Sequence, residues 1–335
     1  GFDDGWIAGA IISGAYFGDK ISMMSDTTVL ASSTAEVPLF KHIKYMMYTT
    51  TPSLIIALIV FSISGFAASP ATAADTMAIE QALSQTYNLS PWLLIVPVLT
   101  GVLISRRLPA IVTLFASVTM AAIAMVIAQP EIIMSIAQSD SPSTMASIYA
   151  IVQAATGSTA IETGNTLLND LVATSGMGGM MDTIWLIICA MCFGGVMYGS
   201  GMLSAISQLF IRLARRTVSV VGSTVCSGLF FNLTTGDQYI SIILTCNLFR
   251  NLYDNSDLER RLLSRSVEDS ATVTSVLIPW NSCGMAQSTV LGVATLTYLP
   301  YCVFNYISPL MSILVAAIGY KIFKRSENEK QTDNI

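Results

Sequence analysis

Long apolar segments recur along this chain, and they limit its fold more than any other feature. Each is close to the roughly 20 residues that a helix needs to cross a bilayer. The candidate spans are Tyr45–Phe66, Leu89–Ser105, Pro109–Gln129, Thr183–Leu203 and Tyr298–Ile322. A backbone in lipid must satisfy its own hydrogen bonds, and helices do so. The sequence therefore predicts an all-α integral membrane protein, a polytopic helical bundle.

The composition agrees with this class and excludes others. Of the 335 residues, 53% are hydrophobic and 11% are charged, against about 25% charged in soluble domains. A net charge of −5 leaves no basic face to neutralise phosphates, so no nucleic-acid partner is expected. We predict ordinary helix roles for the six cysteines and no resident cofactor. The single histidine, His42, follows Lys41 and is predicted to be a surface residue.

Lys and Arg are segregated in a way that orients the bundle. They gather at Lys41/Lys44, Arg106/Arg107 and residues 212–216, 250–265 and 321–330. With these segments in the cytoplasm, Lys20 is the one basic residue away from that side. The connections 67–90, a loop, and 130–182 are then outside, the second with a short interfacial helix over Thr144–Ala155. We predict a multi-pass protein of the plasma membrane whose tail, residues 323–335, is cytoplasmic.

A polar run interrupts the first apolar segment, which begins at Trp6. Residues 14–31 contain two acids, a lysine and several hydroxyls, and the helix is expected to break near Gly18 and Asp19. Polar groups left unpaired in hydrocarbon are costly, so these side chains need partners inside the protein or a water-filled cavity. Acids within a membrane are functional by default. The run is therefore the first candidate site.

Two further interruptions are predicted in the second half. Pro279-Trp-Asn-Ser-Cys-Gly284 lies within the apolar stretch Val273–Leu296, and its proline should break the helix. Val218–Leu248 is too short to cross twice as helices of about 20 residues, and its middle is the polar sequence Asn232–Gln238. We predict a re-entrant hairpin with that turn at its tip. Residues 250–269 are predicted to be a charged connection.

The predicted orientation makes the two interrupted segments inverted copies of one unit. Residues 5–40 run from outside to inside with a break near 18–28, whereas residues 266–296 run from inside to outside with a break near 279–284. Inverted repeats with paired broken helices are typical of secondary transporters, which bind their ions between the breaks. The pattern therefore predicts a secondary transporter.

The repeats give a domain organisation. We predict a single transmembrane transporter domain over residues 1–335. Residues 5–129 are expected to hold the end of the first repeat and the spans that follow it, and residues 183–322 the second repeat. Because the first residue is not Met, the chain is expected to be the C-terminal part of a longer protein.

The residues of the polar run resemble a known family. Gly14-Ala-Tyr-Phe-Gly-Asp-Lys20, followed by Ser22 and Ser25-Asp-Thr-Thr28, is similar to the signature of the NhaC-type sodium/proton antiporters, a family that includes sodium-linked malate/lactate antiporters. Met23 and Val29 depart from that signature, which usually has Pro and Asn there. If the missing amide binds the ion or substrate, the second departure leaves the exact substrate open.

The resemblance extends over nearly the whole chain. Gly236–Ser241, Glu268-Asp269 and Leu277–Gly284 resemble the signatures of the family's second half. The resemblance implies the fold of the ion transporter superfamily, with two inverted repeats that each carry a re-entrant hairpin and a broken helix.

These patterns predict the residues that bind the transported ion. Sodium prefers oxygen ligands, namely carboxylates, hydroxyls and carbonyls. We expect Asp26 to be the carboxylate that exchanges Na⁺ for H⁺, with Thr27 and Thr28 as further sodium ligands and Asp19 as the second choice. Ser25 stands beside them, and Asn281 and Ser282 are expected to approach from the other break.

The sequence leaves more than one role open for three acids and one lysine. Lys20 is expected to pair with Asp19, Asp26 or Asp237. Asp237 is a further ligand candidate, although a hairpin tip is equally compatible with solvation. Glu268 and Asp269, close to Arg265, are expected to form solvated salt bridges or to begin a helix.

The predicted function is secondary active Na⁺/H⁺ antiport at a mid-membrane carboxylate, by alternating access. A buried carboxylate holds either a proton or a sodium ion, so binding one expels the other. The alternative is Na⁺- or H⁺-coupled exchange of an organic acid such as malate for lactate, with Lys20, Asn232, Gln238 and Asn281 as donors. An intramembrane hydrolase lacks an activating base near a nucleophile, so we predict no enzyme activity.

The expected partners follow from this function. They are the lipid bilayer, sodium ions, protons and, in the alternative, a small carboxylate. A channel or a scaffold has no use for paired helix breaks. The sequence leaves the oligomeric state open, a homo-oligomer included.

Overall fold

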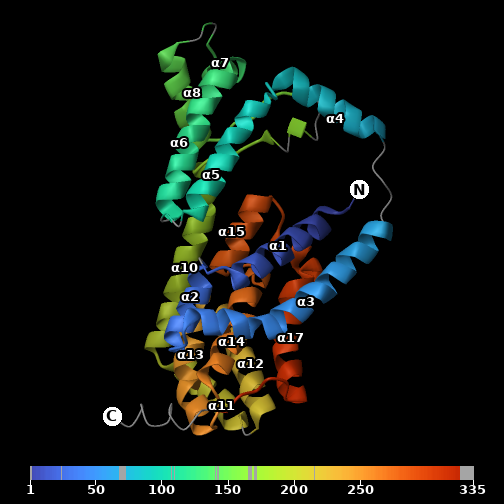
Figure 1. Ribbon diagram of the computed structural model, residues 1–335. Coiled ribbons are helices and arrows are strands. Elements are labelled where there is room, and N and C mark those ends of the chain that lie inside the picture. Colours follow the sequence, from blue (N-terminus) through green and yellow to red (C-terminus); the bar gives the residue numbers. More distant parts are fainter. Residues whose placement is uncertain are drawn as a thin grey trace. The chain divides into compact units, whose positions relative to one another are not determined.

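The computed structural model describes residues 2–23, 25–67, 73–106, 108, 110–139, 141, 143–164, 168–169, 172–214 and 216–324 (Figure 1). The regular secondary structure of these residues is helical, apart from two isolated β-bridges, Thr159–Thr174 and Leu258–Lys324. Contacts divide the chain into two compact units, residues 1–68 with 183–335 (unit 1) and residues 69–182 (unit 2). The prediction of an all-α polytopic membrane protein is confirmed.

Several helices in the described ranges are long and apolar enough to cross a membrane. By length and composition they are Leu39–Phe66, Ile111–Ala128, Gly178–Gly199 and Thr217–Thr235. Two bent pairs, Ile79–Thr86 with Pro91–Ile104 and Thr295–Tyr301 with Val303–Ile318, each pass the same test together. Large apolar side chains such as Phe66, Ile111 and Val196 are exposed on these helices, as lipid-facing residues are.

Unit 2 consists of short helices that pack in pairs. They are α4 (Ala73–Thr86), the 3-10 turn η1 (Pro91–Leu94), α5 (Ile95–Ser105), α6 (Ala110–Ala128), α7 (Pro130–Ala137) and α8 (Thr144–Thr156). α5 packs against α6, and α7 packs against α8. The predicted helix Thr144–Ala155 is confirmed as α8. Arg107 and Pro109, in the predicted turn between two spans, lie outside the described residues.

The prediction of a loop over residues 67–90 is wrong, because α4 lies within it. The sequence of α4 is rich in Ala, Met, Gln and Leu, which favour helix wherever they fall in the chain. The absence of Lys and Arg from this segment bears on the side of the membrane where it lies and not on its secondary structure.

Unit 1 is a bundle of longer helices. They are α1 (Asp4–Ile21), α2 (Asp26–Thr34), α3 (Leu39–Ala67), α10 (Met181–Gly199), α11 (Met202–Leu213), α12 (Thr217–Thr235), α13 (Gln238–Asn255), α14 (Arg260–Val267), α15 (Ser282–Leu291), α16 (Thr295–Tyr298) and α17 (Val303–Ile318). α3 packs against α17, and α12 packs against both α13 and α17. The apolar core has one cluster around Tyr45, Phe249 and Leu262 and another around Ile12 and Phe304.

The first interrupted helix breaks between Ile21, where α1 ends, and Asp26, where α2 begins. Ser25 has an extended backbone and caps α2, because its hydroxyl accepts a hydrogen bond from the amide of Thr28 at 3.4 Å. The break lies slightly later than predicted, since α1 continues through Gly18 and Asp19 to Ile21. Asp19 and Lys20 therefore belong to the last turn of α1.

The second interrupted helix breaks at Pro279, as predicted. A continuous helical stretch leads up to it through α14, the π-helical turn η3 (Glu268–Thr272) and the 3-10 turn η4 (Ser275–Leu277). Asn281 caps α15, and its side chain accepts from the amide of Cys283 at 3.1 Å. The predicted charged connection over 250–269 is wrong, because α13 continues to Asn255 and α14 begins at Arg260.

α12 and α13 form a helical hairpin whose tip lies within Asn232–Gln238, as predicted. Gly236 makes the turn in a left-handed conformation (φ 66°), which glycine adopts most easily. Asp237 then caps α13 by accepting from the amide of Ile240 at 3.0 Å. The arms have 19 and 18 residues, more than the sequence argument allowed. Re-entry of this hairpin, like the inverted repeat, stays a prediction.

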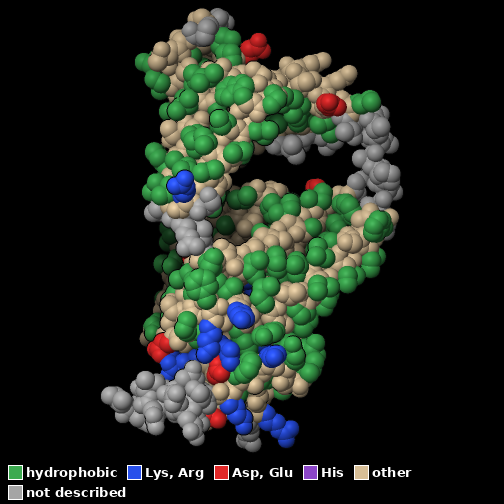
Figure 2. All heavy atoms as spheres, in the orientation of Figure 1, with side chains coloured by type: hydrophobic (Ala, Val, Ile, Leu, Met, Phe, Trp, Pro, Cys, Tyr) green, Lys and Arg blue, Asp and Glu red, His purple; other side chains and the backbone are tan. Residues whose placement is uncertain are grey.

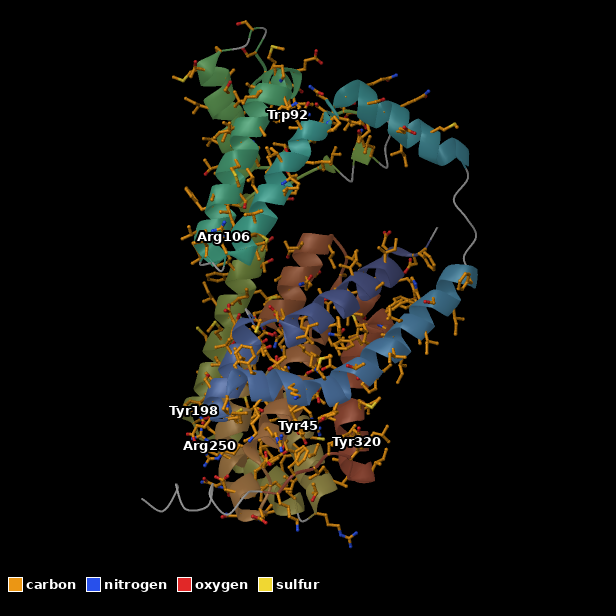
Figure 3. All side chains as sticks on the ribbon, in the orientation of Figure 1. Tyr45, Trp92, Arg106, Tyr198, Arg250 and Tyr320 are labelled. Atoms are coloured by element: carbon orange, nitrogen blue, oxygen red, sulfur yellow. The ribbon has the colours of Figure 1, made fainter. Side chains whose placement is uncertain are left out.

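One end of unit 1, which we call the charged end, carries a cluster of ion pairs. Arg250 and Arg260 both pair with Glu36 there. Figure 2 shows Lys and Arg side chains gathered at this end, and Figure 3 shows Tyr45, Arg250 and Tyr320 toward it. Glu36 is half exposed, and ion pairs of this kind contribute about 0–1 kcal/mol each. They mark an aqueous boundary more than they stabilise the fold.

Candidate ion-binding site

Two neighbouring acids, Glu268 and Asp269, lie in the π-helical turn η3 and are both 0% exposed. A π turn inside an α-helix is uncommon and is frequently found at functional sites. Helices α2, α12, α13 and α17 pack around this turn. A buried carboxylate is costly unless it is paired or hydrogen-bonded, so the contacts of these two acids define what the turn does.

Glu268 is contacted by hydroxyls from the polar run. Oγ1 of Thr27 and Oγ1 of Thr28 lie 3.1 and 3.4 Å from Glu268 Oε1. The Thr27 hydroxyl also lies 2.9 Å from Ser25 Oγ and 3.1 Å from Asp19 Oδ2. Glu268 Oε2 has no hydrogen-bond partner among the described residues. The start of α2 thus faces an acid that belongs to the other interrupted helix.

Lys20 is fully buried and forms an ion pair with Asp269. Its ammonium group also donates to Ser308 Oγ on α17 at 2.8 Å. Asp269 Oδ1 accepts from Thr49 on α3 at 3.2 Å and from Ser308 at 3.1 Å. The partner of Lys20 is therefore Asp269 and none of the three acids that the sequence offered.

The oxygen atoms around these acids suit a hard monovalent cation. The break leaves the carbonyl oxygens of Asp19 and Lys20 within 3.3 and 3.4 Å of Thr28 Oγ1. Carboxylate, hydroxyl and carbonyl oxygens are together the donors that such ions prefer. Across the described ranges, no group of three or more His, Cys, Asp or Glu side chains is gathered for a resident metal ion.

Asp26 and Asp19 are less buried in this chain than these two acids. Asp26 is exposed at the first position of α2, and Asp19 is partly buried. The role predicted for Asp26 stays a prediction. Val29, where the family signature usually has Asn, is 43% exposed and so does not line the buried acids.

Asn281, Ser282 and Asp237 form a second polar group around the hairpin turn. Ser282 Oγ donates to Asp237 Oδ2 at 3.2 Å, and Asn281 Nδ2 donates to the carbonyl of Asn232 at 3.3 Å. The amide of Ser282 donates to the carbonyl of Gly236 at 2.8 Å. These hydrogen bonds join the second break to the hairpin, whereas Ser25, Thr27 and Thr28 face Glu268 and Asp19.

Three assignments from sequence are corrected here. Glu268 and Asp269 are not solvated, because α14 and η3 lie inside the bundle instead of along its edge. His42 is not at the surface: it is 0% exposed, and its Nδ1 lies 2.8 Å from Ser264 Oγ. Every residue from Leu262 to Val276 is buried, whatever its polarity, so no periodic pattern in the sequence could have marked Glu268 and Asp269 as buried.

Comparison with known proteins gives one family. A model of the Na⁺/H⁺ antiporter family matches residues 14–320. The chain is 36% identical over 316 residues to the Na(+)/H(+) antiporter NhaC of Bacillus subtilis, covering 93% of this chain and 66% of that protein. It is 33% identical to the arginine/ornithine antiporter ArcD of Halobacterium salinarum, over 98% of this chain and 65% of that protein.

A further relative has a different printed activity. The chain is 32% identical to the malate-2H(+)/Na(+)-lactate antiporter of Bacillus subtilis, over 98% of this chain and 68% of that protein. No solved structure matches the chain. The chain spans about two thirds of the length of these relatives.

Proposed function

Because the chain belongs to the Na⁺/H⁺ antiporter family, we propose that it exchanges Na⁺ for H⁺ across the membrane and that Glu268 and Asp269 carry the exchange. The observation that most supports this is the burial of both acids against Lys20 and the hydroxyls of the polar run. Lys20, Thr27 and Thr28, which belong to the family signature around the first break, thus contact the carboxylates of Glu268 and Asp269. Relatives named as antiporters support transport over catalysis.

The charges of the buried group explain why the two ions compete. Glu268, Asp269 and Lys20 are all 0% exposed, and Lys20 pairs with Asp269, so an ionised Glu268 has no cation as a direct partner among the described residues. A lone charge in a dry interior is strongly unfavourable. Either one proton or one sodium ion neutralises this negative charge. Binding both together would leave a net positive charge. Binding one therefore displaces the other.

Sodium has ready ligands on the Glu268 side of this group. Glu268 Oε2 has no partner among the described residues, and the hydroxyls of Thr27 and Thr28 face the same carboxylate. The carbonyl oxygens at the end of α1 complete the set. We propose that these atoms hold Na⁺, while Lys20 keeps Asp269 neutralised.

Alternating access requires an element that moves relative to the acids. α2 has nine residues, follows a break and packs against α13, α14 and η3. Movement of α2 over η3 would expose Glu268 to one side or the other, as broken helices do in transporters. We propose that the charged end lies on the cytoplasmic side of the plasma membrane, because Lys and Arg gather there.

Exchange of a small carboxylate is the second candidate. A relative named as a malate/lactate antiporter favours it. Such a substrate needs a cation to bind its carboxylate, and Lys20 is already held by Asp269 and Ser308. The contacts of Lys20 therefore favour ion exchange over a carboxylate substrate bound at Lys20.

The test uses full-length protein in inside-out vesicles that carry an imposed proton gradient. Sodium is added first, then potassium, then malate with and without lactate. We expect sodium alone to collapse the gradient, and the rate to fall by at least about 100-fold in Glu268→Gln, since a positioned proton-transfer group contributes that much. Asp26→Asn is the matched control and should transport like the wild type.

Two results would overturn this assignment. A sodium response that survives Glu268→Gln but disappears in Asp26→Asn returns the exchange to Asp26. A response to malate with lactate, without any response to sodium alone, supports the organic-acid exchanger.

A further inference from the structure

A column of buried polar side chains runs from Asp269 between helices α3, α14 and α17, which pack on one another. At one level, Thr49 of α3 and Ser308 of α17 both donate to Asp269 Oδ1. Ser312 lies one helical turn after Ser308, on the same face of α17, and is 0% exposed. The polar surroundings of Asp269 therefore continue along the helices.

The column ends next to the charged end of unit 1. His42, two turns before Thr49 on α3, places its Nδ1 2.8 Å from Ser264 Oγ on α14. The preceding residue, Lys41, pairs with Glu259 at 3.5 Å and is 42% exposed. His42 is thus fully buried and one residue away from a side chain in contact with solvent.

Several atoms in the column have no hydrogen-bond partner among the described residues. They are Asp269 Oδ2, Ser312 Oγ, His42 Nε2 and all three side-chain nitrogens of Arg265. Arg265 is 0% exposed, and its guanidinium lies 4.6 Å from the centre of the Tyr45 ring. Buried polar atoms are almost always satisfied by protein or by internal water. Internal water in the column would give these donors and acceptors their missing hydrogen bonds.

We propose that this column conducts protons between the charged end and the acids of η3, with His42 as the proton-relay residue and bound water joining it to Ser312 and Asp269, from which the proton passes to the neighbouring Glu268. The inference rests on the proposed function, because it supplies the proton side of the exchange. An imidazole accepts a proton at one ring nitrogen and releases one from the other, which leaves the ring neutral but in the other tautomer, and the ring must return to the first tautomer before the next transfer. Ser264 holds the ring in place.

The charges that face His42 separate this route from that of sodium. Lys20 on α1 and Asp269 are the charged groups that act on His42, and Arg265 on α14 is a second buried cation beside Tyr45 of α3. Two fixed positive charges disfavour a sodium ion resting in the column. A proton that is transferred between side chains and water is bound to one of them at each step, so the column need not hold a free cation. The oxygen ligands for sodium lie on the other side of η3, around Glu268.

The experiment compares two fluxes of the full-length protein in liposomes. Sodium-driven proton flux is followed with a pH dye, and exchange of radioactive sodium for unlabelled sodium is followed without a pH gradient. In His42→Gln we expect proton flux to fall by roughly 100-fold, as for loss of a positioned proton-transfer group, while sodium–sodium exchange keeps its wild-type rate. Ser312→Ala should reduce proton flux alone, by a smaller factor.

Ser53→Ala is the control. Ser53 is also 0% exposed on α3, but its hydroxyl bonds to the carbonyl of Thr49 within its own helix. It should leave both fluxes unchanged. Wild-type proton flux in both His42→Gln and Ser312→Ala would overturn the proposal, and so would equal loss of both fluxes in correctly folded protein. Absence of sodium–sodium exchange in the wild type would instead contradict the proposed function.

Discussion

The two helix breaks of unit 1 are built alike, but the acids beside them differ in whether a carboxylate oxygen is left without a hydrogen bond. Each break is followed by a capped helix, α2 after Ser25 and α15 after Asn281. Each new helix also presents a first-turn hydroxyl to an acid on another element. Thr27 faces Glu268 in the first case, and Ser282 faces Asp237 in the second.

The difference lies in the second carboxylate oxygen. Asp237 uses both of its oxygens, one for the amide of Ile240 and one for Ser282. Glu268 uses Oε1 for the threonines and leaves Oε2 without a partner among the described residues. A satisfied acid ties elements together, whereas an acid with a spare oxygen can take an ion. The proposed function therefore assigns exchange to the first break and a structural role to the second.

The largest effect is expected at the first break, in Asp269→Asn. This change leaves the Lys20 ammonium buried without its charge partner, and breaking a buried pair costs about 3–5 kcal/mol. Thermal unfolding of the purified protein in detergent measures the loss. Replacing both residues, as Lys20→Met with Asp269→Leu, should recover most of the stability but no transport. A single variant as stable as the wild type would show that the pair is not ionised.

A smaller and purely structural effect is expected at the second break, in Asp237→Ala. The change removes the cap of α13 and the acceptor for Ser282, which should cost about 2 kcal/mol. Thermal unfolding should shift downward, while sodium-driven proton flux per folded molecule stays at the wild-type level. A loss of flux at unchanged stability would instead assign the exchange site to the second break.

The smallest effect compares the two capping residues. Ser25→Ala and Asn281→Ala should each destabilise by about 1 kcal/mol, since each removes one cap. Only Ser25→Ala should also weaken the apparent sodium affinity, because Ser25 Oγ contacts the Thr27 hydroxyl at 2.9 Å. Sodium titrations of both variants check this. Equal affinities would mean that α2 is not part of the ion site.

The sequence predicted the architecture of unit 1 better than the identity of its buried acids. Apolar segments, Pro279 and the turn at Gly236 are local signals, and each gave the right kind of element. Burial of Glu268 and Asp269 depends on α2, α12 and α13 packing around η3, which local signals do not report. Nearby arginines suggested solvation, yet Arg265 is itself 0% exposed.

The candidate site was found in part. Thr27, Thr28 and Lys20 came from the polar run and do lie beside the buried acids. The acids that they contact could not be predicted from the sequence. Lys20 and Asp269, for example, are 249 positions apart, and no sequence pattern predicts a contact over that separation. Asp26 was preferred for its place in the motif, but its position at the start of α2 leaves it exposed.

The π-helical turn Glu268–Thr272 also sets how far the helix before it is rotated about its axis relative to the residues after it. A π turn holds one residue more than α geometry needs, so residues beyond it are turned by about 100° relative to an uninterrupted helix. Deleting one residue from the turn would restore a regular helix and rotate α14 against Pro279. Tolerance to insertion and deletion, more than tolerance to substitution, should therefore be lowest across these five residues.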